Sequence, residues 1–111
     1  MSRSAFERLV AEALDGLPES LGEVMDNVVV VVDDLHPDQD LLGLYEGVPL
    51  TERADYGGFV LPDRITLYRL SLCAVATSYQ QLVDEIRVTV VHEVAHHFGI
   101  DDDDLDAWGW G

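Results

Sequence analysis

The sequence predicts a single α+β domain over residues 1–111, and three observations support this fold class. Residues 78–98 have the period of a long helix, and a second helical stretch lies near the N-terminus. Between them lie three short segments with the β-branching or alternation of strands. We expect a small, mostly antiparallel or mixed sheet packed on an N-terminal helix and the long helix.

The first helix is expected from Ser4 to Leu17. Ser4 is a suitable N-cap, and Glu7, three residues further on, completes a capping box. Pro18 then ends the helix because proline cannot continue it. The apolar residues that recur at helical spacing are Phe6, Leu9, Val10, Ala13, Leu14 and Leu17.

Three strands are expected next. The segment Asn27 to Asp33 contains five consecutive valines, which indicates a buried strand. A loop over Asp34 to Asp40 separates it from a short strand, Leu41 to Glu46. The segment Arg64 to Leu70 alternates and follows a Pro-Asp pair, so we expect a third strand at the edge of the sheet.

The long helix has separate apolar and polar faces. Ser78 can cap its start, and Gly99 is the glycine expected just beyond its end. At 100° per residue, its core side comprises Val83, Val90, Val91, Val94, Ala95 and Phe98. Its other side carries Glu85, Thr89, His92 and His96. A last short helix is expected from Asp101 to Trp110.

Charge and composition restrict the partners. The net charge is -16, with 22 acidic residues against 6 arginines and no lysine. Nucleic acids and anionic membranes are therefore not expected as partners, because both need a basic surface. The chain has one cysteine and shows neither a signal peptide nor a membrane-spanning run, which predicts a cytoplasmic protein.

The pattern with the clearest chemistry is His92-Glu93-Val94-Ala95-His96. His92 and His96 stand four residues apart on one helix face, which lets two imidazoles bind one metal ion. Glu93 is rotated by about 100° from His92 and is placed to act on a water beside the metal. Gly99 permits a sharp turn, after which the chain can return with a third ligand.

The longer pattern His92-Glu93-x-x-His96-x-x-Gly99-x-x-Asp102 resembles the extended zincin motif with aspartate as third ligand. The segments 43–53 (GLYEGVPLTER) and 65–69 (ITLYR) are also similar to the minimal zincin-like metallopeptidases of small bacterial proteins. This resemblance covers most of the chain, from about residue 28 to residue 105. It implies a minimal zincin-like fold and one zinc ion per chain, bound by His92, His96 and Asp102.

The implied activity is hydrolysis of peptide bonds by zinc-activated water, with Glu93 as general base. The expected partner is a peptide or protein substrate, with basic peptides favoured by the acidic surface. The substrate is expected to add as a strand to the edge Ile65–Leu70. The candidates for stabilising the oxyanion are Tyr45, Tyr56, Tyr68 and Tyr79.

Several other residues have competing interpretations. Asp101 or Asp103 can replace Asp102 as ligand, or the whole run 101–104 can simply cap the last helix. We expect His97 to pack or hydrogen-bond rather than bind metal, and Cys73 to be a small buried residue rather than a nucleophile. The remaining candidates are His36 as a loop ligand, Trp108 and Trp110 as core cover or contact patch, and 56–59 (YGGF) as a lip or an ordinary loop.

Three alternative functions compete with the peptidase. One is a non-catalytic, zinc-stabilised protein-interaction module, which is favoured because nine residues without a methionine follow Asp102. Another is a metal-dependent endoribonuclease, which the acidic charge and the lack of a third histidine in the motif disfavour. The last is a plain domain with a chance motif, which the resemblance along most of the chain disfavours.

Overall fold

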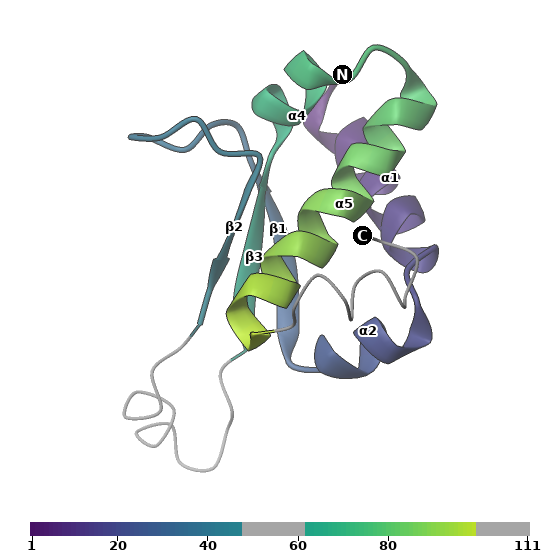
Figure 1. Ribbon diagram of the computed structural model, residues 1–111. Helices are drawn as coiled ribbons and strands as arrows, with labels where there is room; N and C mark the ends of the chain where they lie inside the picture. The colour runs from purple at the N-terminus through teal and green to yellow at the C-terminus, as the bar shows by residue number, and fades with distance from the viewer. Residues whose placement is uncertain (48–61, 100–111) are drawn as a thin grey trace.

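The computed structural model describes residues 1–47 and 62–99. In chain order its elements are α1 (Arg3–Asp15), α2 (Glu19–Val24), β1 (Val28–Asp33), β2 (Gly43–Glu46), β3 (Asp63–Tyr68), α4 (Arg69–Val75) and α5 (Tyr79–Phe98). Helices α1, α2 and α5 lie on the same face of a three-stranded sheet (Figure 1). The fold is therefore α+β, as the sequence predicts.

Helix α1 begins earlier than expected. The Oγ of Ser2, and not that of Ser4, accepts the capping hydrogen bond from the backbone N–H of Ala5, at 3.2 Å. The expected capping box is wrong, because Glu7 instead pairs with Arg3 one turn away, at 3.2 Å. The helix ends at Asp15, before Gly16.

Helix α2 was not expected from the sequence. Its six residues begin directly after Pro18, which is its N-cap. The first helix ends before Pro18, as expected, but Pro18 also starts the second helix, because proline is well tolerated at the start of a helix. Leu21 is fully buried and fixes this short helix to the core.

The sheet is mixed, with strand order β1-β3-β2. β1 pairs parallel with β3, in the register Val30↔Ile65, and β2 pairs antiparallel with β3, in the register Tyr45↔Ile65. The strand expected at the edge is therefore the central one. Arg69 and Leu70, which were expected to extend it, form the first residues of α4 instead.

The five-valine strand lies at an edge of the sheet and is not buried on both faces. Val32 is buried, but Val29 and Val31 remain 43% and 37% exposed. The side chain of Arg3 donates a hydrogen bond to the carbonyl oxygen of Val32, so the start of α1 covers part of this edge. A run of valines alone does not distinguish an edge strand from a central one.

Helix α5 follows the prediction most closely. The Oγ of Ser78 accepts from the backbone N–H of Gln81 at 3.1 Å, and Gly99 ends the helix in the left-handed conformation with φ 68°. Two side chains depart from the expected faces: Phe98 is 47% exposed, whereas Thr89 is 8% exposed. Thr89 is buried because β2 packs across the polar face of the helix at that point.

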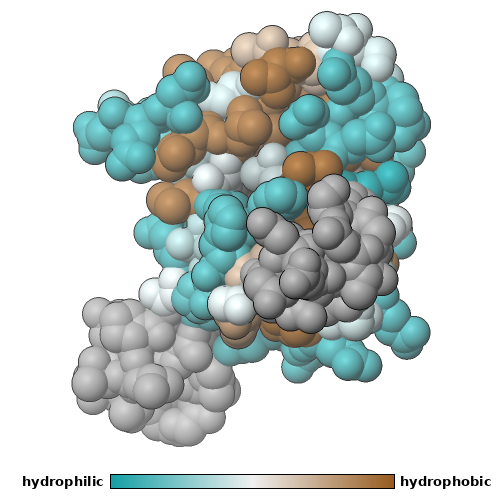
Figure 2. Space-filling model, in the orientation of Figure 1, coloured by the Kyte–Doolittle hydropathy of each residue, from teal (hydrophilic) through white to brown (hydrophobic). Residues whose placement is uncertain are grey.

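The core lies between the sheet and the helices that cover it. Its members come from every described element except β2 and are Phe6, Leu9, Val10, Ala13, Leu21, Val32, Ile65, Leu67, Leu72, Leu82, Val83, Ile86, Val90, Val91, Val94 and Ala95. On the surface, hydrophobic residues gather in the upper half of the face shown in Figure 2. Among the described residues, no helix is long and apolar enough to cross a membrane.

Candidate metal centre

The last turns of α5 place His92 and His96 side by side. Val91, Val94 and Ala95 are fully buried in the core, which fixes the rotation of the helix about its axis. His92 and His96 are consequently turned away from the core, with ring centroids 6.2 Å apart and ring planes at 83°. Four-residue spacing on a helix therefore yields two neighbouring imidazoles, as the motif requires.

Glu93 lies beside these two imidazoles. One of its carboxylate oxygens is 3.8 Å from the Nδ1 of His96, and its side chain is 24% exposed whereas that of His96 is 73% exposed. The carboxylate is thus partly shielded by protein but still reached by water. A general base needs this combination of access to solvent and a fixed position.

His92 and Glu93 both line an open pocket of about 250 Å³ between α5 and the start of β2. The other lining residues are Leu42, Gly43, Glu85, Val88 and Thr89. Gly43 makes this close packing possible, because a Cβ there would lie 2.6 Å from the Cγ2 of Thr89. A glycine within a strand often marks a close approach of another element. Gly43 was therefore the sequence signal that could have predicted the contact between β2 and α5.

The third predicted ligand, Asp102, lies outside the described residues, as do Asp101 and Asp103. Within residues 1–47 and 62–99, no three histidine, cysteine or acidic side chains come together as a metal site. Gly99 is the last described residue, and its backbone N–H donates to the carbonyl oxygen of Ala95. Its left-handed conformation ends the helix three residues beyond His96.

A cluster of His97, Tyr45 and Asp63 joins the end of α5 to the sheet. The ring of His97 stacks on that of Tyr45, with centroids 3.9 Å apart, and its Nε2 is 3.8 Å from Asp63 Oδ2. The hydroxyl of Tyr45 donates to the same carboxylate oxygen at 2.7 Å. His97 thus has the packing role expected for it, whereas sequence reasoning gave no role to Asp63.

The tyrosine candidates differ in their distance from His92 and His96, the predicted metal ligands. Tyr45 stacks on the neighbour of His96, whereas Tyr79 is thirteen residues before His92, or about 20 Å along the helix. The hydroxyl of Tyr79 donates to Glu12 at 2.6 Å, which raises the pKa of Tyr79. Tyr79 therefore serves the helix packing and not this site.

Tyr68 is buried at the end of β3. Burial raises the pKa of Tyr68, and the carboxylates of Glu46 and Asp33 raise it further, whereas Arg64 opposes them. Tyr68 also meets the ring of His36 edge-on, at 5.7 Å between centroids. Tyr68 is the last residue of β3, whereas Asp63, which contacts His97, is the first residue of that strand.

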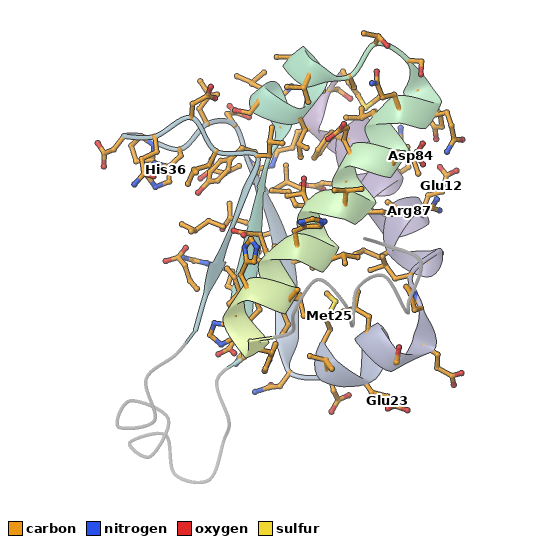
Figure 3. All side chains as sticks on the ribbon, in the orientation of Figure 1. Glu12, Glu23, Met25, His36, Asp84 and Arg87 are labelled. Carbon is orange, nitrogen blue, oxygen red and sulfur yellow. The ribbon has the colours of Figure 1, made fainter. Side chains whose placement is uncertain are left out.

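The remaining candidates lie elsewhere. His36 is in the loop after β1, away from α5 (Figure 3), where its Nδ1 accepts from the backbone N–H groups of Asp38 and Gln39. Cys73 is half-buried against the core and forms no disulfide. Tyr56, residues 56–59, Trp108 and Trp110 lie outside the described residues.

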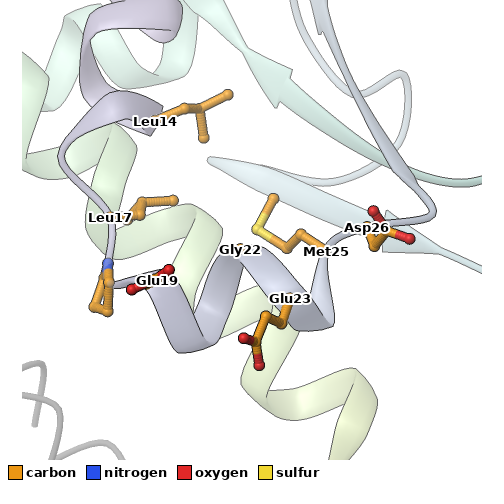
Figure 4. A pocket seen from close by; sticks show the side chains of 8 residues that line it. Leu14, Leu17, Glu19, Gly22, Glu23, Met25 and Asp26 are labelled. Atoms are coloured by element: carbon orange, nitrogen blue, oxygen red, sulfur yellow. The ribbon is translucent and has the colours of Figure 1, made fainter.

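A larger pocket, of about 470 Å³, lies between the end of α1 and α2 (Figure 4). Its lining is largely apolar, with acidic side chains: Leu14, Leu17, Pro18, Glu19, Gly22, Glu23, Met25 and Asp26. In the part of the chain that the structure describes, it shares no lining residue with the pocket at His92, and no histidine lines it. The smaller pocket is therefore the better candidate for chemistry.

The side chains around His92 fit a zinc ion. Two neighbouring imidazoles are ligands that zinc prefers, and a third protein ligand with an open fourth position is the usual catalytic arrangement. His92 is half-buried and His96 is exposed, and His92 lines the open pocket of about 250 Å³. His92 and His96 are therefore placed as two of the predicted ligands, with the Glu93 carboxylate beside them.

Comparisons with known proteins support the fold and reveal the family. A solved structure of a conserved hypothetical protein from Thermus thermophilus is similar over 88% of this chain and 94% of its own, with a TM-score of 0.57 and 24% identity. No curated protein matches the sequence. The zincin-like metallopeptidase family matches residues 25–110, which is most of the chain and includes the whole of α5. This chain therefore belongs to the zincin-like metallopeptidase family.

Proposed function

We propose that this protein is a zinc-dependent peptidase in which His92, His96 and Asp102 hold the metal and Glu93 is the general base. The observation that carries the proposal is the pair of neighbouring imidazoles, 6.2 Å apart, with the Glu93 carboxylate beside them at the pocket. Bound zinc would supply a Lewis acid that polarises the peptide carbonyl and lowers the pKa of water to about 7.

Glu93 has two tasks in this reaction. Its carboxylate removes the proton from the attacking water and later returns that proton to the leaving amine. The position of Glu93 in the pocket lining supports this assignment, because a structural metal site would not need a carboxylate open to a substrate. Its partial exposure leaves room for both water and the leaving group.

In this proposal the peptide substrate pairs with the edge of β2 that faces away from β3, and not with β3. Both edges of β3 are already paired, with β1 on one side and β2 on the other, so the edge expected at Ile65–Leu70 does not exist. Within the described chain, β2 pairs with β3 alone, and Leu42 and Gly43 line the pocket at His92. An extended peptide paired with β2 would therefore run past Glu93.

The first test is the metal content of the purified protein, measured by elemental mass spectrometry. We expect about one zinc per chain in the wild type and in Glu93→Gln, none in His92→Ala, and much less in Asp102→Ala. His36→Ala is the matched control, because His36 lies in a loop away from α5 and its loss should leave the zinc content unchanged. A wild-type protein that takes up no zinc would refute the assignment.

The second test separates a peptidase from a zinc-stabilised interaction module. Wild-type protein and Glu93→Gln, both loaded with zinc, are compared for cleavage of a peptide library. We expect Glu93→Gln to lose at least about a hundredfold in turnover, in line with the contribution of general base catalysis. Equal behaviour of the two proteins would support the non-catalytic module instead.

A further inference from the structure

The pocket at His92 extends along α5 towards the N-terminal end of the helix. Glu85, Val88, Thr89 and His92 lie on successive turns of one helix face and all line it. Glu85 precedes His92 by seven residues, which is about 10 Å along a helix. The pocket therefore continues from the metal-binding end to a carboxylate two turns away.

The chemistry of this lining is apolar with negative charge. Among the lining residues in the described part of the chain, Leu42 and Val88 supply apolar side chains, and Glu85 and Glu93 are ionisable alongside His92. None of the lining residues that the structure describes is an arginine. A long side chain with an aliphatic stem and a cationic end matches such a surface, because its stem covers apolar area while its end meets the carboxylate.

Glu85 differs from its neighbour Asp84 in its surroundings. Asp84 accepts a hydrogen bond from Nε2 of Gln80 at 3.1 Å and lies on the α1 side of α5, next to Arg87 (Figure 3). Glu85 has neither a hydrogen bond nor an ion pair within the part of the chain that the structure describes. Its carboxylate is therefore available to a ligand in the pocket.

We propose that Glu85 is a specificity-determining residue of the peptidase and selects an arginine or lysine side chain of the substrate. The proposal rests on the function proposed above, since the substrate strand is taken to lie along β2. A strand rises about 3.3 Å per residue, so the selected side chain belongs to the residue about three positions from the scissile bond. A glutamate at the same position is repelled.

Binding is measured separately from cleavage, so that this proposal and the proposed function can fail independently. The probes are capped alanine–glycine peptides of one length that carry a single arginine, norleucine or glutamate at each position in turn. Their affinities for zinc-loaded Glu93→Gln are determined by isothermal titration calorimetry. We expect the arginine peptide to bind about fivefold more tightly than the norleucine peptide at one position, and the glutamate peptide to bind most weakly.

Two variants and one control attribute this preference to Glu85. In the Glu93→Gln background, Glu85→Gln removes the preference for arginine, and Glu85→Arg reverses it in favour of glutamate. Asp84→Asn makes the same charge change one residue away, outside the pocket, and keeps the preference. Chemical shifts of the labelled methyl groups of Val88 should respond to the arginine peptide in the parent and in Asp84→Asn.

The outcomes are decisive in both directions. Binding preference for arginine that depends on Glu85, without cleavage by the wild type, would support the pocket assignment and refute the peptidase. Cleavage of all peptides at equal rates, with equal affinities, would support the peptidase and refute a role for Glu85. Undetectable binding of every peptide, or a preference that Asp84→Asn abolishes as well, would also overturn the proposal.

Discussion

The two halves of α5 are held in place by different kinds of contact. In the first half, Tyr79 donates a hydrogen bond to Glu12, and the Nε of Arg87 donates to the carbonyl oxygen of Ala13 at 2.9 Å. Both contacts attach the helix to α1, and Arg87 meets a carbonyl at the C-terminal end of α1. Figure 3 shows Arg87 and Glu12 on this side of α5.

The second half of α5 faces the sheet and carries the candidate chemistry. There the contacts are the close approach of Thr89 to Gly43 and the stacking of His97 on Tyr45. One helix thus contains residues that attach it to α1 and residues that contact β2 beside the candidate site. Truncation of buried residues in the first half should lower stability without changing zinc content per folded molecule, whereas changes at the contacts of the second half with β2 should alter the pocket at His92.

The largest effect on stability is expected from Ile86→Ala. Ile86 is fully buried in the first half, and its truncation should lower the free energy of unfolding by about 2–5 kcal/mol. Urea denaturation followed by circular dichroism measures the loss. Val88→Ala is the control, since Val88 is 40% exposed and should cost little. A reduced zinc content per folded molecule in Ile86→Ala would break the separation between the two halves.

Gly43→Ala tests the contact between β2 and the second half. The added Cβ would lie 2.6 Å from Thr89 Cγ2 and 3.2 Å from the carbonyl oxygen of Thr66, so we expect a loss of about 1–3 kcal/mol. Zinc content should persist, whereas peptide affinity should fall because β2 is displaced. Gly22→Ala is the matched control, because a Cβ there meets nothing within 4 Å, and should be neutral or stabilising. Unchanged stability of Gly43→Ala would contradict the close packing.

Tyr45→Phe removes one hydrogen bond from the second half but keeps the stacked ring. The lost bond to Asp63 should cost about 1 kcal/mol, because the pair is partly buried. Calorimetric unfolding measures the change, and amide exchange near Phe98 should become faster. If Tyr45→Phe is as stable as the wild type, the cluster does not hold the end of α5.

The smallest effect is expected from Tyr79→Phe in the first half, and it depends on pH. The bond to Glu12 raises the pKa of Tyr79 above its ordinary value of 10.0, so its contribution is present below that value and is lost as the pH rises through the raised pKa. As the pH rises from neutral to about 11, the free energy of unfolding should therefore fall less in Tyr79→Phe than in the wild type. Identical alkaline slopes of the two proteins in urea titrations would contradict the role of this bond.

The sequence predicted the parts of the fold that depend on local pattern. Ser78, Gly99 and the apolar period between them specify α5, and with it the positions of His92, Glu93 and His96 on the helix. The metal-ligand roles of these residues remain predictions, as does that of Asp102. Local pattern is sufficient here because the spacing along a helix determines which side chains are neighbours.

Features that depend on pairing were predicted poorly. The five valines in β1 suggested a buried strand, and the alternation in β3 suggested an edge strand. In the sheet, β1 lies at an edge and β3 lies at the centre. Strand order arises from contacts between distant segments, which a single sequence does not display. The partnership of Asp63 with Tyr45 and His97 is of the same kind, because these residues come from β3, β2 and α5.

The hydrogen bond from Arg3 to the Val32 carbonyl has a consequence for self-association. An edge strand of consecutive valines is a ready template for a strand from another molecule, and such growth leads to fibrils. Arg3 occupies one of the acceptors that an incoming strand would need, and the net charge of -16 keeps other copies at a distance. Within residues 1–47 and 62–99, the Arg3 side chain thus blocks part of this edge, and the accompanying charge repulsion weakens as salt screens it.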